Sequence, residues 1–239
     1  RRKMAQSGQQ QSVHQHSGWL LPAGFAFAIM LLSGLLLGWY LRPGLRAPAA
    51  LTGQSEPVPV TLASLNLRVP ANYIQNPAAR SGGPQESLSL AALFPSWQGY
   101  SAELARQFQG NAPNSAVVRI LIRHDADAMD AATRLARIYR PNLAALEGAP
   151  GPFGLRQYGF AADSGYEKTD LFVGGSGRGL LLFLCGRPAA DLPSPNCQAT
   201  DRPLADGVSY SFRFKRAWLA RWRELSGGVD GLIARFEKA

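Results

Sequence analysis

The sequence predicts an α+β protein, with one N-terminal transmembrane helix followed by a mainly antiparallel sheet domain and a few packed helices. Three observations support this. Residues 19–41 carry no charge. After residue 57, strand patterns outnumber helical ones, and most connections are too short for the crossovers that parallel strands need. The chain also ends in amphipathic helical patterns, as expected for helices packed on a sheet.

The sequence divides into four predicted parts. Residues 1–18 are polar and Gln-rich and should form a short tail without a core of its own. Residues 19–41 should form the transmembrane helix, and 42–57, rich in Pro, Gly and Ala, should form a linker. Residues 58–239 are numerous enough for one compact domain.

The apolar segment has the length of a membrane span. A helix over 19–41 would be about 34 Å long, enough to cross a hydrocarbon core of about 30 Å. The apolar core of a signal peptide is shorter, about 7–15 residues, so we expect an uncleaved anchor, although Ala47–Ala49 offers a small-residue motif. The residues expected at the membrane interfaces, in contact with the lipid bilayer, are Trp19, Trp39, Tyr40, Arg42 and Arg46.

Small residues recur at four-residue spacing within this segment. Gly34 and Gly38 match the GxxxG pattern, and Gly24 with Ala28 repeats the spacing. Such pairs let helix backbones approach closely in lipid. We therefore expect the helix to pack against other integral membrane protein subunits.

The two cysteines bear on the compartment. Cys185 and Cys197 are an even pair enclosing a Pro-rich loop, which suits a disulfide in an oxidising compartment; two unpaired buried thiols in a cytosolic domain are the alternative. Arg far outnumbers Lys, and no Asn begins an Asn-x-Ser/Thr acceptor. We expect a bacterial inner membrane, with the N-terminus cytoplasmic and the C-terminal domain periplasmic.

The first half of this domain reads mainly as strands. Residues 60–70 predict an early hairpin, and the apolar residues of 116–123 alternate with polar ones. Residues 85–94 follow a turn signal. Between these strands, 102–109 predict a short helix capped by Ser101.

A longer helix is predicted over about 128–140, ending before Pro141. Asp127 can cap its start, because an Asp side chain accepts hydrogen bonds from the free N–H groups of the first turn. Asp130 should pair with Arg134 four residues later.

The second half predicts further strands at 153–161, 168–175 and 208–214. The run 179–185 is continuously apolar and predicts a central strand. The Gly-rich 174–179 lacks the ending of a P-loop, so we interpret it as a hairpin turn.

Two amphipathic helical pieces, 214–225 and 229–236, should close the chain, interrupted by Ser226–Gly228. Their apolar stripes predict that both pieces pack on the sheet.

No pattern specifies a reaction. His124 is the only histidine after the apolar segment, and its neighbours Asp125 and Asp127 suit a strand end and a helix start better than a metal site. No HExxH or GxSxG motif occurs. Carboxylates brought together by folding stay open as an alternative, but no spacing singles out a pair. We therefore predict no catalytic residue, cofactor or metal site.

The net charge of +9 is unevenly distributed. Residues 1–46 hold five basic and no acidic residues, which leaves 20 basic against 16 acidic residues in the remainder. The high pI thus partly reflects the flanks of the apolar segment, and we expect no nucleic-acid binding.

Two groups of residues are candidate partner contacts. Phe94, Trp97 and Tyr100 form an aromatic corner that either covers the core or is exposed as an anchor for a partner. Arg134 and Arg137 line one flank of their helix and could contact an acidic partner or anionic headgroups.

The pieces "VPANYI" and "FPSWQGYS", with the placing of Cys185 and Cys197, resemble an uncharacterised family of single-pass bacterial inner-membrane proteins with a periplasmic domain of unknown function. The resemblance implies an anchored domain and transfers no active-site residue.

The leading functional hypothesis is a non-enzymatic, membrane-anchored accessory subunit that stabilises or regulates a larger inner-membrane complex. A periplasmic sensor or binding module for envelope lipid or polymer is one alternative. A carboxylate-dependent envelope hydrolase is the other. A pocket with convergent polar groups would favour the binding module.

Overall fold

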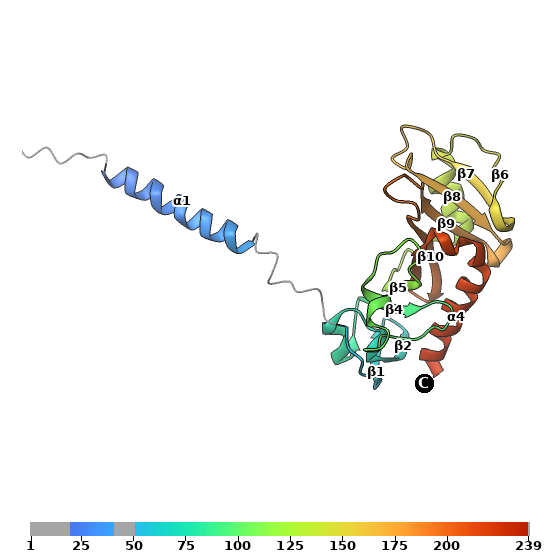
Figure 1. The fold of residues 1–239 in the computed structure, drawn as a ribbon, viewed down its shortest axis with the longest axis horizontal. Coiled ribbons are helices and arrows are strands. Elements are labelled where there is room, and N and C mark those ends of the chain that lie inside the picture. Colours follow the sequence, from blue (N-terminus) through green and yellow to red (C-terminus); the bar gives the residue numbers. More distant parts are fainter. Residues whose placement is uncertain (1–19, 41–50, 239) are drawn as a thin grey trace, which may run out of the picture. The chain divides into compact units, whose positions relative to one another are not determined.

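The computed structural model describes residues 20–40 and 51–238 (Figure 1). The predicted tail and most of the predicted linker therefore lie outside the described residues. The chain separates into two compact units, with the division between Pro48 and Ala49. Each unit is described by itself.

The N-terminal unit contains one helix, α1 (Leu20–Tyr40). Its stretch Pro22–Trp39 is long and apolar enough, by length and composition, to cross a membrane. Pro22 lies in the first turn, where its missing N–H breaks no intrahelical bond. The predicted N-terminal apolar helix is confirmed.

The C-terminal unit is built on an eight-stranded sheet of order β4-β5-β11-β10-β9-β8-β7-β6, in which every neighbouring pair is antiparallel. A smaller sheet has the order β2-β1-β3 and holds the one parallel pairing between described strands. The strands are β1 (Pro57–Leu62), β2 (Leu65–Pro70), β3 (Gly83–Pro84), β4 (Ser87–Leu93), β5 (Val117–His124), β6 (Ala149–Pro150), β7 (Arg156–Gly159), β8 (Thr169–Gly174), β9 (Leu181–Gly186), β10 (Asn196–Ala205) and β11 (Val208–Lys215). The predicted α+β class is confirmed.

Local patterns account for several strands. The hairpin of β1 and β2 and the interior position of β9 are as predicted. The turn between β8 and β9 needs glycines, because Gly175 and Gly177 have φ angles of 73° and 55°. In β11, Tyr210 and Phe212 face the core, whereas Arg213 faces the other side and is exposed.

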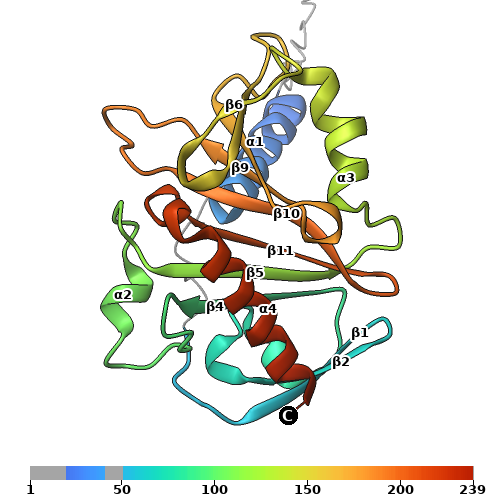
Figure 2. The same cartoon turned by 90° about the vertical axis from the view of Figure 1, so that its right-hand side faces the viewer.

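One face of the large sheet is covered by α4 (Trp222–Lys238), which Figure 2 shows crossing β11 and β5. The predicted interruption at Ser226–Gly228 is wrong, because α4 runs through it unbroken after a 3-10 turn, Arg216–Arg221. A Cβ added at Gly228 would overlap the Trp97 ring. Gly228 is therefore needed for close packing and does not end a helix.

The opposite face is covered in two places. Near β4, α2 (Ala105–Gln109) buries Phe108 against side chains of β4 and β5. The predicted Ser101 cap is wrong, because 101–104 form a turn closed by the Leu104 N–H and the Ser101 carbonyl at 3.1 Å, and α2 begins only afterwards. Gly110 ends α2.

The second cover is a helical segment, 131–142, which begins with α3 (Ala131–Arg134) and continues as π and 3-10 turns. It packs on β8 and β9 through the buried Tyr139. Between α2 and this segment, part of the sheet face is open and carries mainly polar side chains (Arg119, Gln198, Ser211 and Arg213), with Leu121 among them.

The predicted cap of this segment is wrong by three residues. Asp130 caps it, accepting from the Thr133 N–H at 2.8 Å, and this hydrogen bond holds the pKa of Asp130 below its usual value. Asp127 instead lies in a turn closed by the Ala128 N–H. Pro141 belongs to the last 3-10 turn, Arg140–Asn142. It lies near the start of this turn, where a missing N–H costs little.

Candidate partner-binding surface

A short loop after β6, Gly151–Leu155, presents Phe153 to solvent. The side chain is 53% exposed, and its φ of 61° lies in a region that bulky residues rarely adopt. The Gly151 N–H donates to the Leu155 carbonyl at 2.8 Å, and the Trp222 indole N–H donates to the Phe153 carbonyl at 3.2 Å. The exposed ring is therefore held on a fixed backbone.

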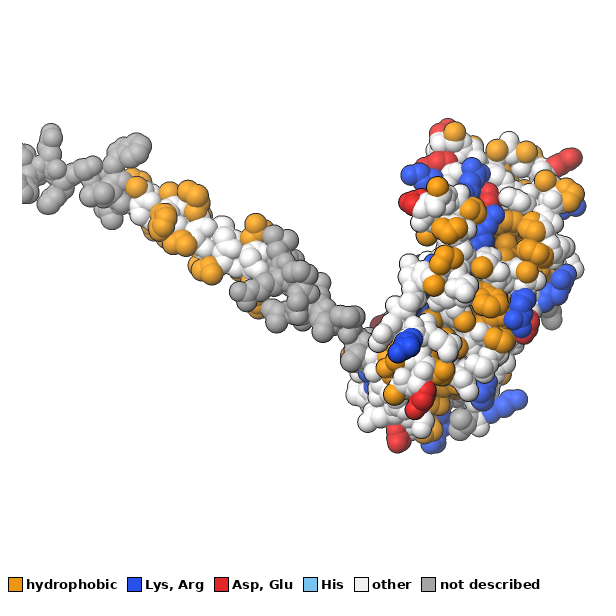
Figure 3. All heavy atoms as spheres, in the orientation of Figure 1, with side chains coloured by type: hydrophobic (Ala, Val, Ile, Leu, Met, Phe, Trp, Pro, Cys, Tyr) orange, Lys and Arg blue, Asp and Glu red, His pale blue; other side chains and the backbone are white. Residues whose placement is uncertain are grey.

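Arg223 lies beside this loop. Its guanidinium stacks over the Trp222 ring at 4.2 Å from the centroid, and a Cβ on Gly154 would lie 3.6 Å from Nη2. Arg223 is exposed and forms no ion pair with any described residue. Trp222 is only 4% exposed and supports the two exposed side chains, Phe153 and Arg223. We name these three residues the aromatic–arginine patch. Figure 3 shows hydrophobic side chains bordered by basic ones over the region where Figure 1 draws β6 and the start of α4.

The predicted aromatic corner mainly covers the core. Phe94 is only 2% exposed and packs edge-to-face on Trp97 and Trp218, with centroids 5.8 and 5.3 Å apart. Its assignment as a partner contact is wrong, because the neighbouring rings bury it. Trp97 and Tyr100 are half-buried, and Tyr100 packs on Phe108. For these two a partner contact stays a prediction.

Arg134 fastens the helical segment to the sheet. Its guanidinium donates to Asp201 at 3.2 Å, and Asp201 also accepts from Arg123 at 3.0 Å. The predicted pairing of Arg134 with Asp130 is therefore not formed. Arg134 is largely enclosed, whereas Arg137 is exposed and stays a candidate contact.

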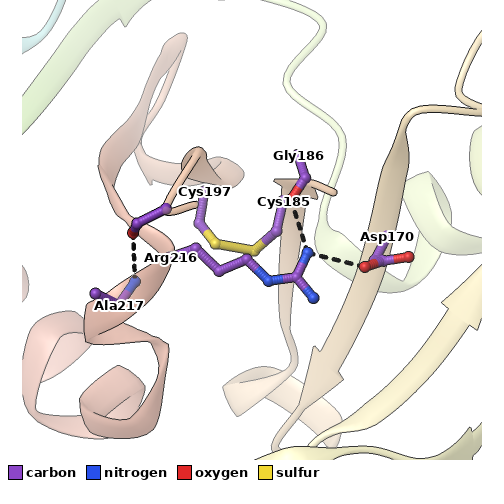
Figure 4. Close-up of a disulfide and its surroundings, with 7 residues drawn as sticks. Asp170, Cys185, Gly186, Cys197, Arg216 and Ala217 are labelled. Atoms are coloured by element: carbon purple, nitrogen blue, oxygen red, sulfur yellow. Dashed lines mark hydrogen bonds and ion pairs between the residues drawn. A yellow bond between two sulfur atoms is a disulfide. The ribbon is translucent and has the colours of Figure 1, made fainter. Parts of the chain in front are cut away.

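Cys185 and Cys197 form a disulfide between β9 and β10, with both residues fully buried. Figure 4 shows Arg216 beside this bridge, pointing toward Asp170 on β8. Arg216 donates to Asp170 at 2.8 Å and to the Gly186 carbonyl at 2.7 Å, and Arg187 donates to Asp170 at 3.0 Å. A covalent and an ionic link thus join adjacent strands.

The remaining predicted residues lie on or near α1. The predicted helix-packing residues are all exposed within the N-terminal unit: Gly24, Ala28, Gly34 and Gly38. Of the predicted interface residues, Trp39 is exposed, Tyr40 ends the helix, and Trp19, Arg42 and Arg46 lie outside the described residues. Their roles in lipid stay predictions.

The residues around His124 make structural contacts. His124 Nδ1 lies 3.5 Å from a Glu86 oxygen, and Asp125 accepts from Arg123 and from the Ser209 hydroxyl. Within 20–40 and 51–238, no three His, Cys, Asp or Glu side chains are grouped to hold a metal ion. Sequence reasoning missed Phe153, although "GPFG" marks a turn around an aromatic residue, whereas Arg223 stands out in the sequence as one of several arginines near the start of the closing helix.

Tyr210 connects the sheet to α4. Its hydroxyl donates to Asp230, which also accepts from Arg202 at 3.0 Å. Burial, followed by the hydrogen bond to Asp230, raises the pKa of Tyr210 well above its ordinary value.

We expect the protein to lose stability as the pH rises above about 10, the pKa of an unfolded tyrosine. A pKa raised by folding means that the stabilisation is complete below that pH and is lost above it. Tyr210→Phe should flatten this decline, which urea unfolding between about pH 9 and 11 would measure. The same alkaline slope in both proteins would contradict the assignment to Tyr210.

These features define an α+β domain on an eight-stranded antiparallel sheet with one disulfide, preceded in the chain by an apolar helix. The fold is similar to that of Smlt3025, an immunity protein of the Stenotrophomonas maltophilia type IV secretion system, with a TM-score of 0.54, 18% sequence identity and coverage of 76% of this chain and 93% of that one. The Neisseria meningitidis iron-regulated outer membrane lipoprotein FrpD matches at a TM-score of 0.47 and 11% identity, over 81% and 97% of the two chains, which is too low to support an argument. At these identities the likeness concerns the fold alone. No protein-family model and no curated protein matches the chain.

Proposed function

We propose that this chain is a non-enzymatic, membrane-anchored accessory protein whose C-terminal unit docks on a larger inner-membrane complex of a bacterium. The observation that carries the proposal is the aromatic–arginine patch. Aromatic and Arg side chains dominate the binding energy of protein interfaces. A loop whose backbone is already held by hydrogen bonds loses little conformational entropy on binding. The patch therefore has the composition and the rigidity of a docking site.

Other features support a membrane partner. An anchor through α1 would hold the C-terminal unit near other membrane proteins, at a high effective concentration. The small residues of α1 would let a partner helix approach closely. The disulfide supports a periplasmic location for the C-terminal unit, and the fold shared with an immunity protein of a secretion system is compatible with a non-enzymatic role.

A photo-cross-linking amino acid placed at position 153 tests the proposal in the membranes of the cells that make the protein. We expect an adduct with one membrane protein, and we expect that protein to co-purify with the wild-type chain but not with Phe153→Ser. The matched control is position 192, because Leu192 is also on a loop and 45% exposed. The same adducts from both positions, or an adduct only with a second copy of this chain, would overturn the proposal.

A further inference from the structure

Besides the aromatic–arginine patch, the domain has a polar surface on the sheet face opposite α4. Between α2 and the helical segment 131–142, side chains of β4, β5, β10 and β11 surround a hollow of about 180 Å³. Arg119, Arg213 and Gln198 line this hollow together with Ser89, Ser211 and the apolar Leu121. It therefore combines two positive charges with several hydrogen-bonding groups.

Arg119 and Arg213 are neighbours on this face of the sheet, and both are exposed. Arg119 and Arg213 are paired Cα positions in the register of β5 and β11, and like charges at directly opposed positions destabilise a sheet. Arg213 donates to Gln198 at 3.2 Å, and neither arginine forms an ion pair with a described residue. The fold thus tolerates an unfavourable charge pair here.

A neighbouring arginine on the same face shows the contrast. Arg123, four residues after Arg119 on β5, donates to Asp125 at 3.1 Å and to Asp201 at 3.0 Å. A carboxylate placed between Arg119 and Arg213 would give them the same kind of partner. No described residue of the chain supplies one.

The size of the hollow limits the ligand. Pockets that enclose small molecules have volumes of about 300–1,000 Å³, whereas this open hollow has a volume of about 180 Å³ and therefore suits one protruding side chain better than an enclosed lipid or polymer unit. A carboxylate can accept charge-assisted hydrogen bonds from two guanidinium groups at once.

We infer that Arg119 and Arg213 bind the carboxylate of an Asp or Glu side chain on a partner protein. This inference rests on the proposed function, because the carboxylate is taken to belong to a partner protein on which the domain docks. It does not depend on the aromatic–arginine patch, which lies on the α4 side of the sheet.

The test uses the full chain in a non-ionic detergent and follows its thermal unfolding by tryptophan fluorescence. The probe is the peptide acetyl-Gly-Glu-Gly-Glu-Gly-amide, and its Gln counterpart is the control. We expect the Glu peptide to raise the unfolding midpoint in a concentration-dependent manner and the Gln peptide to leave it unchanged.

Arg119→Gln and Arg213→Gln should each weaken the apparent affinity about tenfold, because one charged hydrogen-bonding partner is lost. Without peptide, both variants should unfold at the wild-type midpoint or above it, since the repulsion between the two arginines is relieved. Arg235→Gln is the matched control, because Arg235 is exposed on α4 and should leave the affinity unchanged.

Three results would overturn the inference. The first is binding of the Gln peptide as tightly as the Glu peptide, and the second is an equal loss of binding in Arg235→Gln. The third is tighter binding of inorganic phosphate or of anionic phosphatidylglycerol vesicles with the same dependence on Arg119. Phe153→Ser should leave peptide binding intact. The cross-linking experiment at position 153 therefore tests the proposed function, and the peptide experiment separately tests the carboxylate site.

Discussion

Gly228→Ala should lower the free energy of unfolding by about 1–3 kcal/mol, the cost of overpacking a core site. A methyl group at this position would overlap the Trp97 ring. The ring cannot easily retreat, because Trp97 has a φ of 55° and its carbonyl accepts from the Tyr73 hydroxyl at 3.0 Å. Gly231→Ala is the matched control within α4. A Cβ added at Gly231 would have no neighbour within 4 Å, so the better helix propensity of Ala should stabilise the protein by about 0.5–1 kcal/mol.

Urea unfolding of both variants, followed by circular dichroism, measures the two effects. In a Trp97→Ala background, Gly228→Ala should become neutral or stabilising, because the clashing ring is absent. Equal effects of Gly228→Ala in the two backgrounds would show that the contact with Trp97 does not require this glycine.

The same contact explains one limit of sequence reasoning. The segment Ser226–Gly228 has the composition of a helix break, and only the fold brings Trp97 against it from far away in the chain. Strands are easier to predict, because a strand with one buried face repeats every two residues. The alternation of apolar and polar residues identifies the hairpin of β1 and β2 and also β11, although Ser209 and Ser211 on the second face of β11 are buried as well.

The candidate sites depend on contacts that no local pattern contains. The exposure of Phe153 follows from the way Trp222 holds its loop, and Arg119 lies opposite Arg213 only through the register of β5 and β11. The burial of Phe94 has the same origin, because Trp218 covers it. A short motif can therefore mark a turn or an aromatic corner without showing which ring remains in solvent.

Asp170→Asn should destabilise the protein by about 3 kcal/mol, because it removes the carboxylate from an enclosed ion pair. Asp170 is 7% exposed, and the Arg216 side chain that it binds is 19% exposed. The guanidinium would keep its charge and its position near the disulfide but lose its counter-ion. Chemical unfolding with the disulfide intact measures the change. Glu224→Gln is the matched control, since its pairing with Arg221 is solvent-exposed and should contribute less than about 1 kcal/mol.

A second substitution separates the charge effect from a packing effect. If the uncompensated charge of Arg216 is the cause, Arg216→Met should recover part of the stability lost in Asp170→Asn, because a buried ion pair can be replaced by apolar side chains at little cost. If Asp170→Asn costs no more than Glu224→Gln, water compensates Arg216, and the ion pair beside the disulfide does not contribute to holding β8 and β9 together. Arg187, the second arginine that pairs with Asp170, is 46% exposed and can be solvated by water. The expected loss of stability in Asp170→Asn is therefore attributed to Arg216 alone.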